Sequence, residues 1–165
     1  KTFFTNKPKT IRILNCDATS STNLDHLLSD SKSTEIFMRN LDVRNVTDMS
    51  DMFFNCNSAT TIDIANWNTS SAKNLSNVFY YCQNVTALDL SSWNTSNVTS
   101  MDSMFDGCSG LKSLDLSNFN TSNVTNMYDM FEWCTSLTSL DVSNFNTSNV
   151  FWFITNISFN YYLFN

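Results

Sequence analysis

Four aspartates recur at one spacing and are the first residues of the chain that could do chemistry. Each stands between two apolar residues, so its side chain would point away from a buried face. A row of carboxylates on a sheet face could hold a divalent cation such as calcium, or bind a basic partner. We favour the alternative, in which each aspartate is a structural residue satisfied by neighbouring Ser and Thr hydroxyls. The four residues lie 26 positions apart and are Asp63, Asp89, Asp115 and Asp141.

Four of the five cysteines share this spacing: Cys56, Cys82, Cys108 and Cys134. If successive repeats pair like strands, their Cα atoms lie about 4.8 Å apart, which is within disulfide range. Equivalent side chains of neighbouring repeats point the same way, however, so we expect buried free thiols. The chain has no C-x-x-C pair and a single histidine, so no metal site is predicted.

Asparagines in N-x-[ST] triplets form the third recurrent group. In a secretory eukaryote several of them would carry glycans on the protein surface. The alternative is turn chemistry, in which the asparagine side chains cap backbone groups between structural elements. The candidate glycosylation residues are Asn68, Asn94, Asn97, Asn120, Asn123 and Asn146.

Catalysis finds little support in these patterns. A nucleophile needs a positioned base, and the single histidine, His26, lies in a degenerate early repeat. The carboxylates form a regular row and not a pair in contrasting environments. We therefore predict that the chain is not an enzyme and uses no cofactor.

The elements that would position these residues repeat every 26 residues. Complete units begin at Ile36, Ile62, Leu88 and Leu114, a degenerate unit begins at Ile11 and a truncated unit at Leu140. Apolar residues at positions 1 and 3 of a unit predict a short strand with one buried face. Apolar residues at positions 11, 14, 17, 18 and 21 have helical spacing and predict a short α or 3-10 segment.

Position 6 is aromatic in the four later units and is Cys16 and Leu41 in the two early ones. Such a row could be a platform for sugar stacking, but its place beyond two inward-facing residues favours the core. The methionines at positions 14 and 17 are expected to fill gaps in the same core. The aromatic residues are Trp67, Trp93, Phe119 and Phe145.

One unit cannot bury its own apolar face, whereas stacked units can. We divide the chain into an N-terminal cap segment (1–10), a repeat region (11–150) and a C-terminal segment (151–165). Alternating apolar residues from Ile157 to Leu163 predict a strand there. This strand would close the open end of the core, or join another subunit end to end.

The phrase L-D-L-S-x-[FW]-N-T-S-N-V-T-x-M-x-x-M-F-x-x-C-x-x-L resembles the BspA-like leucine-rich repeats of microbial surface proteins. The match covers about residues 36–150 strongly and 11–35 weakly. One systematic departure is Asn at positions such as Asn68 and Asn94, where the family commonly has Asp. The resemblance implies an α/β repeat solenoid, a right-handed coil with one parallel sheet face and short helical or 3-10 segments opposite. It also implies secretion or display on the cell surface, and a role in attachment.

The charge distribution excludes some partners. Net charge is −6, and residues 45–165 carry two basic and ten acidic groups. Nucleic acid is an unsuitable partner, because phosphate contacts need clustered Lys and Arg. The longest apolar stretch, 151–164, is shorter than the roughly 20 residues of a membrane helix, so no membrane span is predicted. No leader peptide is visible at Lys1, so one would have to be removed or lie outside this sequence.

The sequence therefore predicts a non-enzymatic surface or secreted protein that mediates adhesion by binding a protein or glycan on another cell or matrix. The alternative is a structural subunit of an extracellular filament or coat, glycosylated through the N-T-S row. A further hypothesis, calcium-dependent folding through the aspartate row, predicts a melting temperature that calcium raises.

Overall fold

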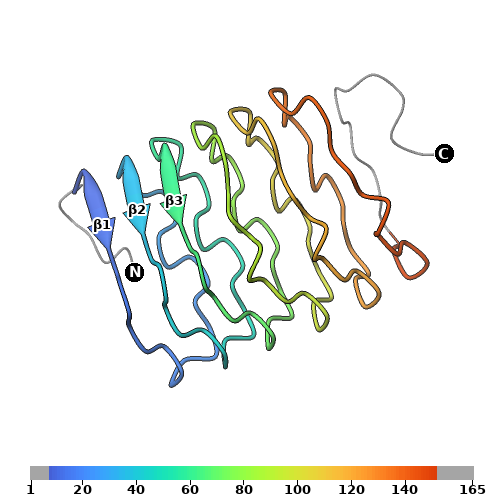
Figure 1. The fold of residues 1–165 in the computed structure, drawn as a ribbon, viewed down its shortest axis with the longest axis horizontal. Helices are drawn as coiled ribbons and strands as arrows, with labels where there is room; N and C mark the ends of the chain where they lie inside the picture. The colour runs from blue at the N-terminus through green and yellow to red at the C-terminus, as the bar shows by residue number, and fades with distance from the viewer. Residues whose placement is uncertain (1–7, 152–165) are drawn as a thin grey trace.

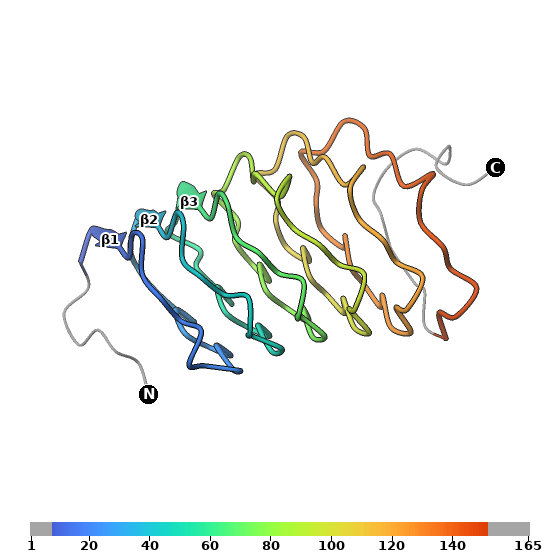
Figure 2. The same cartoon turned by 60° about the horizontal axis from the view of Figure 1, so that its bottom comes forward.

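A computed structural model of the chain describes residues 8–151. Within this range the repeat units lie side by side in sequence order, as Figure 1 shows from one direction and Figure 2 from another. Three short strands, β1 (Thr10–Arg12), β2 (Glu35–Phe37) and β3 (Thr61–Asp63), form one parallel sheet in the order β1-β2-β3. Their register pairs Ile11 with Ile36 and Ile36 with Ile62, one repeat apart.

Pairing between units continues beyond the three strands at single positions. Isolated parallel bridges connect one residue of each unit to its equivalent in the next, from Asn23 to Asn126. The bridged residues are Asn23, Asp48, Asn74, Ser100 and Asn126. Equivalent residues of successive units therefore form rows through the molecule, and these rows position every candidate site below.

The predicted fold class, an α/β repeat solenoid with a leucine-rich-repeat-like right-handed coil, is wrong. Residues 8–151 contain no α-helix and no 3-10 segment, and their regular structure is limited to the three short strands. Turns and irregular segments make up most of the chain. The segments that were expected to be helical opposite the sheet are runs of turns.

The directions of the backbone amide groups explain why these segments are not helical. In an α-helix every amide bonds four residues back. Here Met101, Ser103, Phe105 and Gly107 donate instead to carbonyls of the next unit, at 2.8 to 3.0 Å. The amides between them close tight turns, as from Met104 to the carbonyl of Met101. Apolar spacing alone could not distinguish this arrangement from a helix, because both bury the same positions.

Strands were also expected in the later units and do not form in the described residues after β3. From Trp67 onward, position 6 carries an aromatic ring, and the rings of Trp67 and Trp93 stack with centroids 6.3 Å apart. Backbone bonds between these later units continue elsewhere, as from Met101 to the carbonyl of Asn126, so pairing is lost at the strand positions and not along the whole unit. Near these positions a side-chain amide connects the units instead of a backbone amide: Nδ2 of Asn118 donates to the carbonyl oxygens of Leu90 and Trp93, at 3.0 and 2.7 Å.

The core runs through all units and contains the residues expected there. Trp67, Trp93 and Phe119 are almost fully buried and Phe145 is partly buried, which confirms that the aromatic row belongs to the core. The methionines at positions 14 and 17 are buried, for example Met101. A second aromatic row, at position 18, stacks with centroids 5.6 to 5.7 Å apart. Its members are Phe53, Phe79, Phe105 and Phe131.

Two expectations fall on residues outside the described range. The strand expected from Ile157 to Leu163, with its capping or assembly role, lies beyond residue 151, and most of the N-terminal cap segment lies before residue 8. Among the described residues there is no helix with the length and apolarity needed to span a membrane.

Candidate functional site

The aspartate row lies on the repeat units as a set of turn residues. Oδ1 of Asp89 accepts hydrogen bonds from the amide of Ser91 (3.1 Å) and from its hydroxyl (2.6 Å). Asp115 and Asp141 accept the amide two residues ahead in the same way, at 3.0 and 2.9 Å. This is the geometry of an Asx turn, in which the side chain holds its own backbone.

Asp63 differs from the other three members of the row. Its carboxylate forms an ion pair with Arg39, with 2.9 Å between Nη2 and Oδ2, and it also accepts the amide of Ala65. Hydrogen bonds to Ser91 lower the pKa of Asp89, and bonds to the serine two residues ahead lower the pKa values of Asp115 and Asp141. Three members of the row therefore hold their own turns, with a serine hydroxyl added at Asp89, and Asp63 binds an arginine of the preceding unit.

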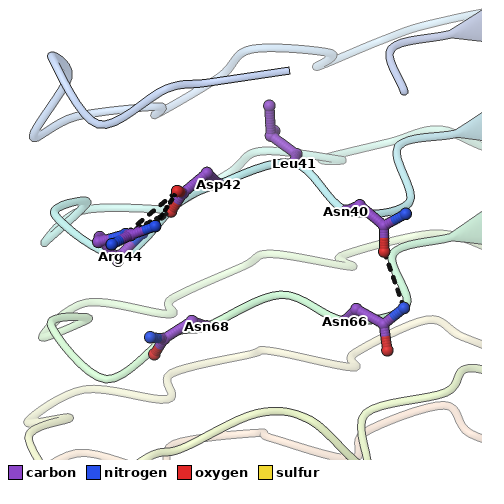
Figure 3. A pocket seen from close by; sticks show the side chains of 6 residues that line it. All are labelled: Asn40, Leu41, Asp42, Arg44, Asn66 and Asn68. Carbon is purple, nitrogen blue, oxygen red and sulfur yellow. Dashed lines mark hydrogen bonds and ion pairs between the residues drawn. The ribbon is translucent and has the colours of Figure 1, made fainter. Parts of the chain in front are cut away.

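Two shallow hollows lie beside the row. One has a volume of about 250 Å³ and is lined by Asn40, Asp42, Arg44 and Asn66 (Figure 3). Within it Arg44 donates to Asp42, and Nδ2 of Asn66 donates to Oδ1 of Asn40 at 2.8 Å. The other, of about 150 Å³, lies between the units of Asp115 and Asp141. Both are smaller than the roughly 300–1,000 Å³ of ordinary ligand pockets, and the polar groups of the first already bind one another.

The structure divides the candidate glycosylation residues into two classes. Nδ2 of Asn97 donates to the carbonyl of Ser70 at 2.8 Å, and Nδ2 of Asn123 donates to Ser96 at 2.7 Å, so the atoms that would carry a glycan hold neighbouring units together. The other four use Oδ1 to accept the amide two residues ahead, and their side chains are exposed. These four are Asn68, Asn94, Asn120 and Asn146.

The cysteine row is aligned and buried. The thiol of Cys82 donates to the carbonyl of Phe53, and the thiols of Cys108 and Cys134 make the equivalent contacts at 3.1 Å. All five cysteines are free, and Cys16 is the exposed one. Burial raises the pKa of Cys56 and of Cys134 to about 12, which suppresses thiolate chemistry.

One further surface carries exposed aromatic side chains among partly buried acidic ones, and the sequence did not reveal it. It is built from positions 15, 16, 19 and 20 of three successive units, and we call it the aromatic–acidic face. Backbone bonds align these units, since Tyr81 donates to the carbonyl of Asp106 and Gly107 donates to that of Glu132, both at 2.8 Å. The side chains of the face are Tyr80, Tyr81, Asp102, Asp106, Tyr128, Asp129, Glu132 and Trp133.

The aromatic side chains of this face are unusually open to solvent. Tyr81, Tyr128 and Trp133 are 36%, 42% and 56% exposed, whereas the other rows of aromatic rings are packed inside. Exposed Tyr and Trp are enriched where proteins bind partners, because each combines a large apolar surface with a polar group. The face therefore has the composition of an interaction surface.

Asp106 lies at the centre of this face. The residue is only 7% exposed, and its Oδ1 has no hydrogen-bond partner. Burial, and then the neighbouring Glu132, Asp129 and Asp102, raise the pKa of Asp106 to about 7. Among residues 8–151 no group of three or more His, Cys, Asp or Glu side chains is arranged to hold a metal ion.

The aromatic–acidic face lies at positions of the repeat whose residues differ from unit to unit. Positions 19 and 20 are Tyr80-Tyr81 in one unit, Asp106-Gly107 in the next and Glu132-Trp133 in the third. Recurring residues build the stack of units, so residues that differ between units are free to provide specificity. Large aromatic residues at variable positions were the signal that could have located the face.

Comparison with known proteins gives one match. The family model described as "Mycoplasma protein of unknown function, DUF285" matches residues 1–112 and again residues 74–161. No curated protein and no solved structure matches the chain significantly.

Proposed function

This chain belongs to the family of Mycoplasma proteins of unknown function, DUF285, and we propose that it is a non-enzymatic binding module. In this proposal the module is secreted or displayed on the cell surface, where it attaches to a protein or glycan of another cell or matrix. The aromatic–acidic face is the surface through which it binds.

The observation that carries the proposal is the exposure of Tyr81, Tyr128 and Trp133 on the two units that flank the unit of Asp106. Keeping such side chains in water is unfavourable, and burying their remaining apolar surface against a partner stabilises the complex by about 25 cal/mol per Å². The predicted binding row is less suited to this role, because Asp89, Asp115 and Asp141 already hold their own turns.

One further feature supports the location, and a second is compatible with it. The repeat phrase resembles BspA-like surface repeats, which are used for attachment. The four recurring thiols are buried and free, so a stack of these units needs no disulfide bonds for its assembly. Such a scaffold would present the same face in an oxidising or a reducing environment.

Selection from a random peptide library on the immobilised chain tests the binding role. Binders are compared on the wild type, on the variants Tyr128→Ser and Trp133→Ser, and on Leu14→Ser as control. Leu14 is 43% exposed and belongs to the first unit, so this control also removes an exposed apolar side chain. We expect binders that require Tyr128 and Trp133 but not Leu14. An absence of binders, or binders that tolerate all three substitutions equally, would contradict the proposal.

A further inference from the structure

We propose that the aromatic–acidic face binds a basic segment of a partner protein, with an Arg or Lys side chain pairing with Asp106 and Glu132. This inference rests on the proposed function and adds the chemical class of the partner. It depends on three properties of the face: uncompensated charge, a buried carboxylate oxygen without a partner, and open aromatic rings.

The first property is the charge. The ion pairs found in residues 8–151 are Arg39–Asp63 and Arg44–Asp42, and His26 lies near Asp25 and Asp51; all of these residues belong to the first three units. Asp102, Asp106, Asp129 and Glu132 take part in none of them. The charged groups that influence Asp106 are all acidic, and the chain beyond residue 44 contains only two basic residues, Lys73 and Lys112. A concentration of one sign of charge attracts the opposite charge on a partner.

The second property is the state of Asp106. Its Oδ1 is buried with no hydrogen bond, and an unsatisfied buried oxygen is costly. A guanidinium or ammonium group that docks on the face brings a positive charge next to this carboxylate, so it offsets the repulsion from Glu132 and supplies N–H donors to the acidic groups that it reaches. A neutral sugar hydroxyl would supply a hydrogen bond but leave the repulsion in place. The crowded carboxylates therefore favour a cationic ligand over a glycan.

The third property is the set of open rings. A cation above the face of Tyr or Trp is attracted to the ring, and an arginine side chain stacks on it with its planar guanidinium group. Trp133 is next to Glu132 in sequence, and the ring of Tyr81 lies over Gly107, the neighbour of Asp106. Asp129, Glu132 and Asp102 lie near Tyr128, so exposed rings and acidic groups share this surface. Several such groups suit a peptide with several basic side chains better than an isolated small cation.

Fluorescence anisotropy with the full chain tests the inference, with labelled oligo-arginine as probe and oligo-glutamate as its control, at physiological ionic strength. The variant Asp102→Asn/Glu132→Gln is compared with Asp115→Asn/Asp141→Asn, which removes the same number of charges away from the face. We expect oligo-arginine to bind, with an affinity about tenfold weaker in the first variant and within about twofold of wild type in the second. If both variants bind oligo-arginine equally weakly, binding depends only on the net charge of the chain and the inference is wrong. The inference is also wrong if oligo-arginine does not bind the wild type.

Two further outcomes separate this inference from the proposed function. If selected binders need Trp133 but lack Arg and Lys, the basic partner is wrong and the binding role stands. If binders ignore Trp133, both proposals fail. Competition with spermine tests whether the ligand is a peptide or a small polyamine. If spermine displaces oligo-arginine when both are present at the same concentration of positive charge, the ligand is a small polyamine and the inference of a basic peptide is wrong. If the chain self-associates and D102N/E132Q abolishes this self-association, the face binds a second copy of the chain, and the inference of a basic partner is again wrong.

Discussion

The ring of Tyr81 lies directly against the backbone of Gly107 in the next repeat unit. A Cβ atom on Gly107 would come 2.6 Å from Cδ2 of Tyr81, closer than side chains tolerate. Gly107 also has a positive φ of 72°, but Asn55 and Trp133 occupy the same position of other units with φ of 53° and 56°. The backbone there accepts a side chain, so it is the tyrosine ring above it that requires glycine.

Gly107→Ala should therefore destabilise the protein mainly through Tyr81. We expect the free energy of unfolding to fall by about 1–2 kcal/mol, because the added methyl group displaces a packed ring. Denaturant unfolding of Gly107→Ala, Tyr81→Ala and the double variant gives the coupling between the two sites. The alanine at position 107 should cost clearly less when Tyr81 is already removed. Strictly additive effects would show that backbone conformation, and not the ring, selects glycine.

A buried threonine row connects neighbouring units and provides a second test. Oγ1 of Thr95 donates to the carbonyl of Asn120 at 3.0 Å and accepts the amide of Asn120 at 2.8 Å. Thr95→Val keeps the shape but leaves both backbone groups unpaired, so we expect a loss of about 2 kcal/mol in unfolding free energy. Thr95→Ser retains the hydroxyl and should cost clearly less.

Thr147 offers a matched control at the same position of the last unit, where the side chain is exposed. Thr147→Val should change the unfolding free energy by less than about 0.5 kcal/mol. Comparable losses for Thr95→Val and Thr147→Val would mean that the bonds to Asn120 contribute little to holding the units together.

The sequence predicted the period, the core and the buried thiols, because each follows from spacing and residue type alone. The position of every core row can be read from recurrence at 26 residues, from the aromatic position of Trp67 to the cysteine position of Cys82. Burial depends on which side of the backbone a residue faces, and spacing decides that. The prediction of these rows is therefore robust to the local backbone conformation.

The backbone conformation itself could not be predicted in this way. The spacing of Met101, Met104 and Phe105 fits a helix as well as it fits turns that alternate with bonds to the next unit. The difference lies in where each amide points, which depends on contacts with residues about 25 positions away. The aromatic–acidic face was missed for a related reason: Asp106 gains its properties from burial and then from Glu132 and Asp129 of a neighbouring unit, and a repeat consensus averages such differences away.

The raised pKa of Asp106 gives stability a pH dependence of a definite sign. Its carboxyl titrates at about 7 in the folded protein and near 3.8 when unfolded, so the folded state holds the proton between these values. The free energy of unfolding should therefore fall as pH rises from about 4 to about 7. Asp106→Asn removes this dependence, and its gain over wild type should be on the order of 2 kcal/mol larger near pH 8 than near pH 4.

Asp115→Asn is the control for this titration. Its carboxyl pKa is lowered by the amide of Ser117, so its contribution is present above about pH 4 and lost in acid. The substitution should therefore cost more near pH 8 than near pH 3, opposite in sign to Asp106→Asn. Urea unfolding across this pH range distinguishes the two variants. A gain from Asp106→Asn that is the same at all pH values would contradict an ionisation-linked effect.

The buried cysteine row should make thiol modification a direct measure of unfolding. The pKa values of Cys56 and Cys134 are raised to about 12 by burial, and the more deeply buried Cys82 and Cys108 are also strongly raised. Thiolate is the reactive form, so none of these four reacts in the folded protein. An aromatic disulfide reagent should modify only the exposed Cys16 in native protein, and all five thiols in denaturant. Cys16→Ser should abolish the native reaction, leaving a slow phase that follows unfolding, whereas rapid native modification of this variant would show that the row is open to solvent.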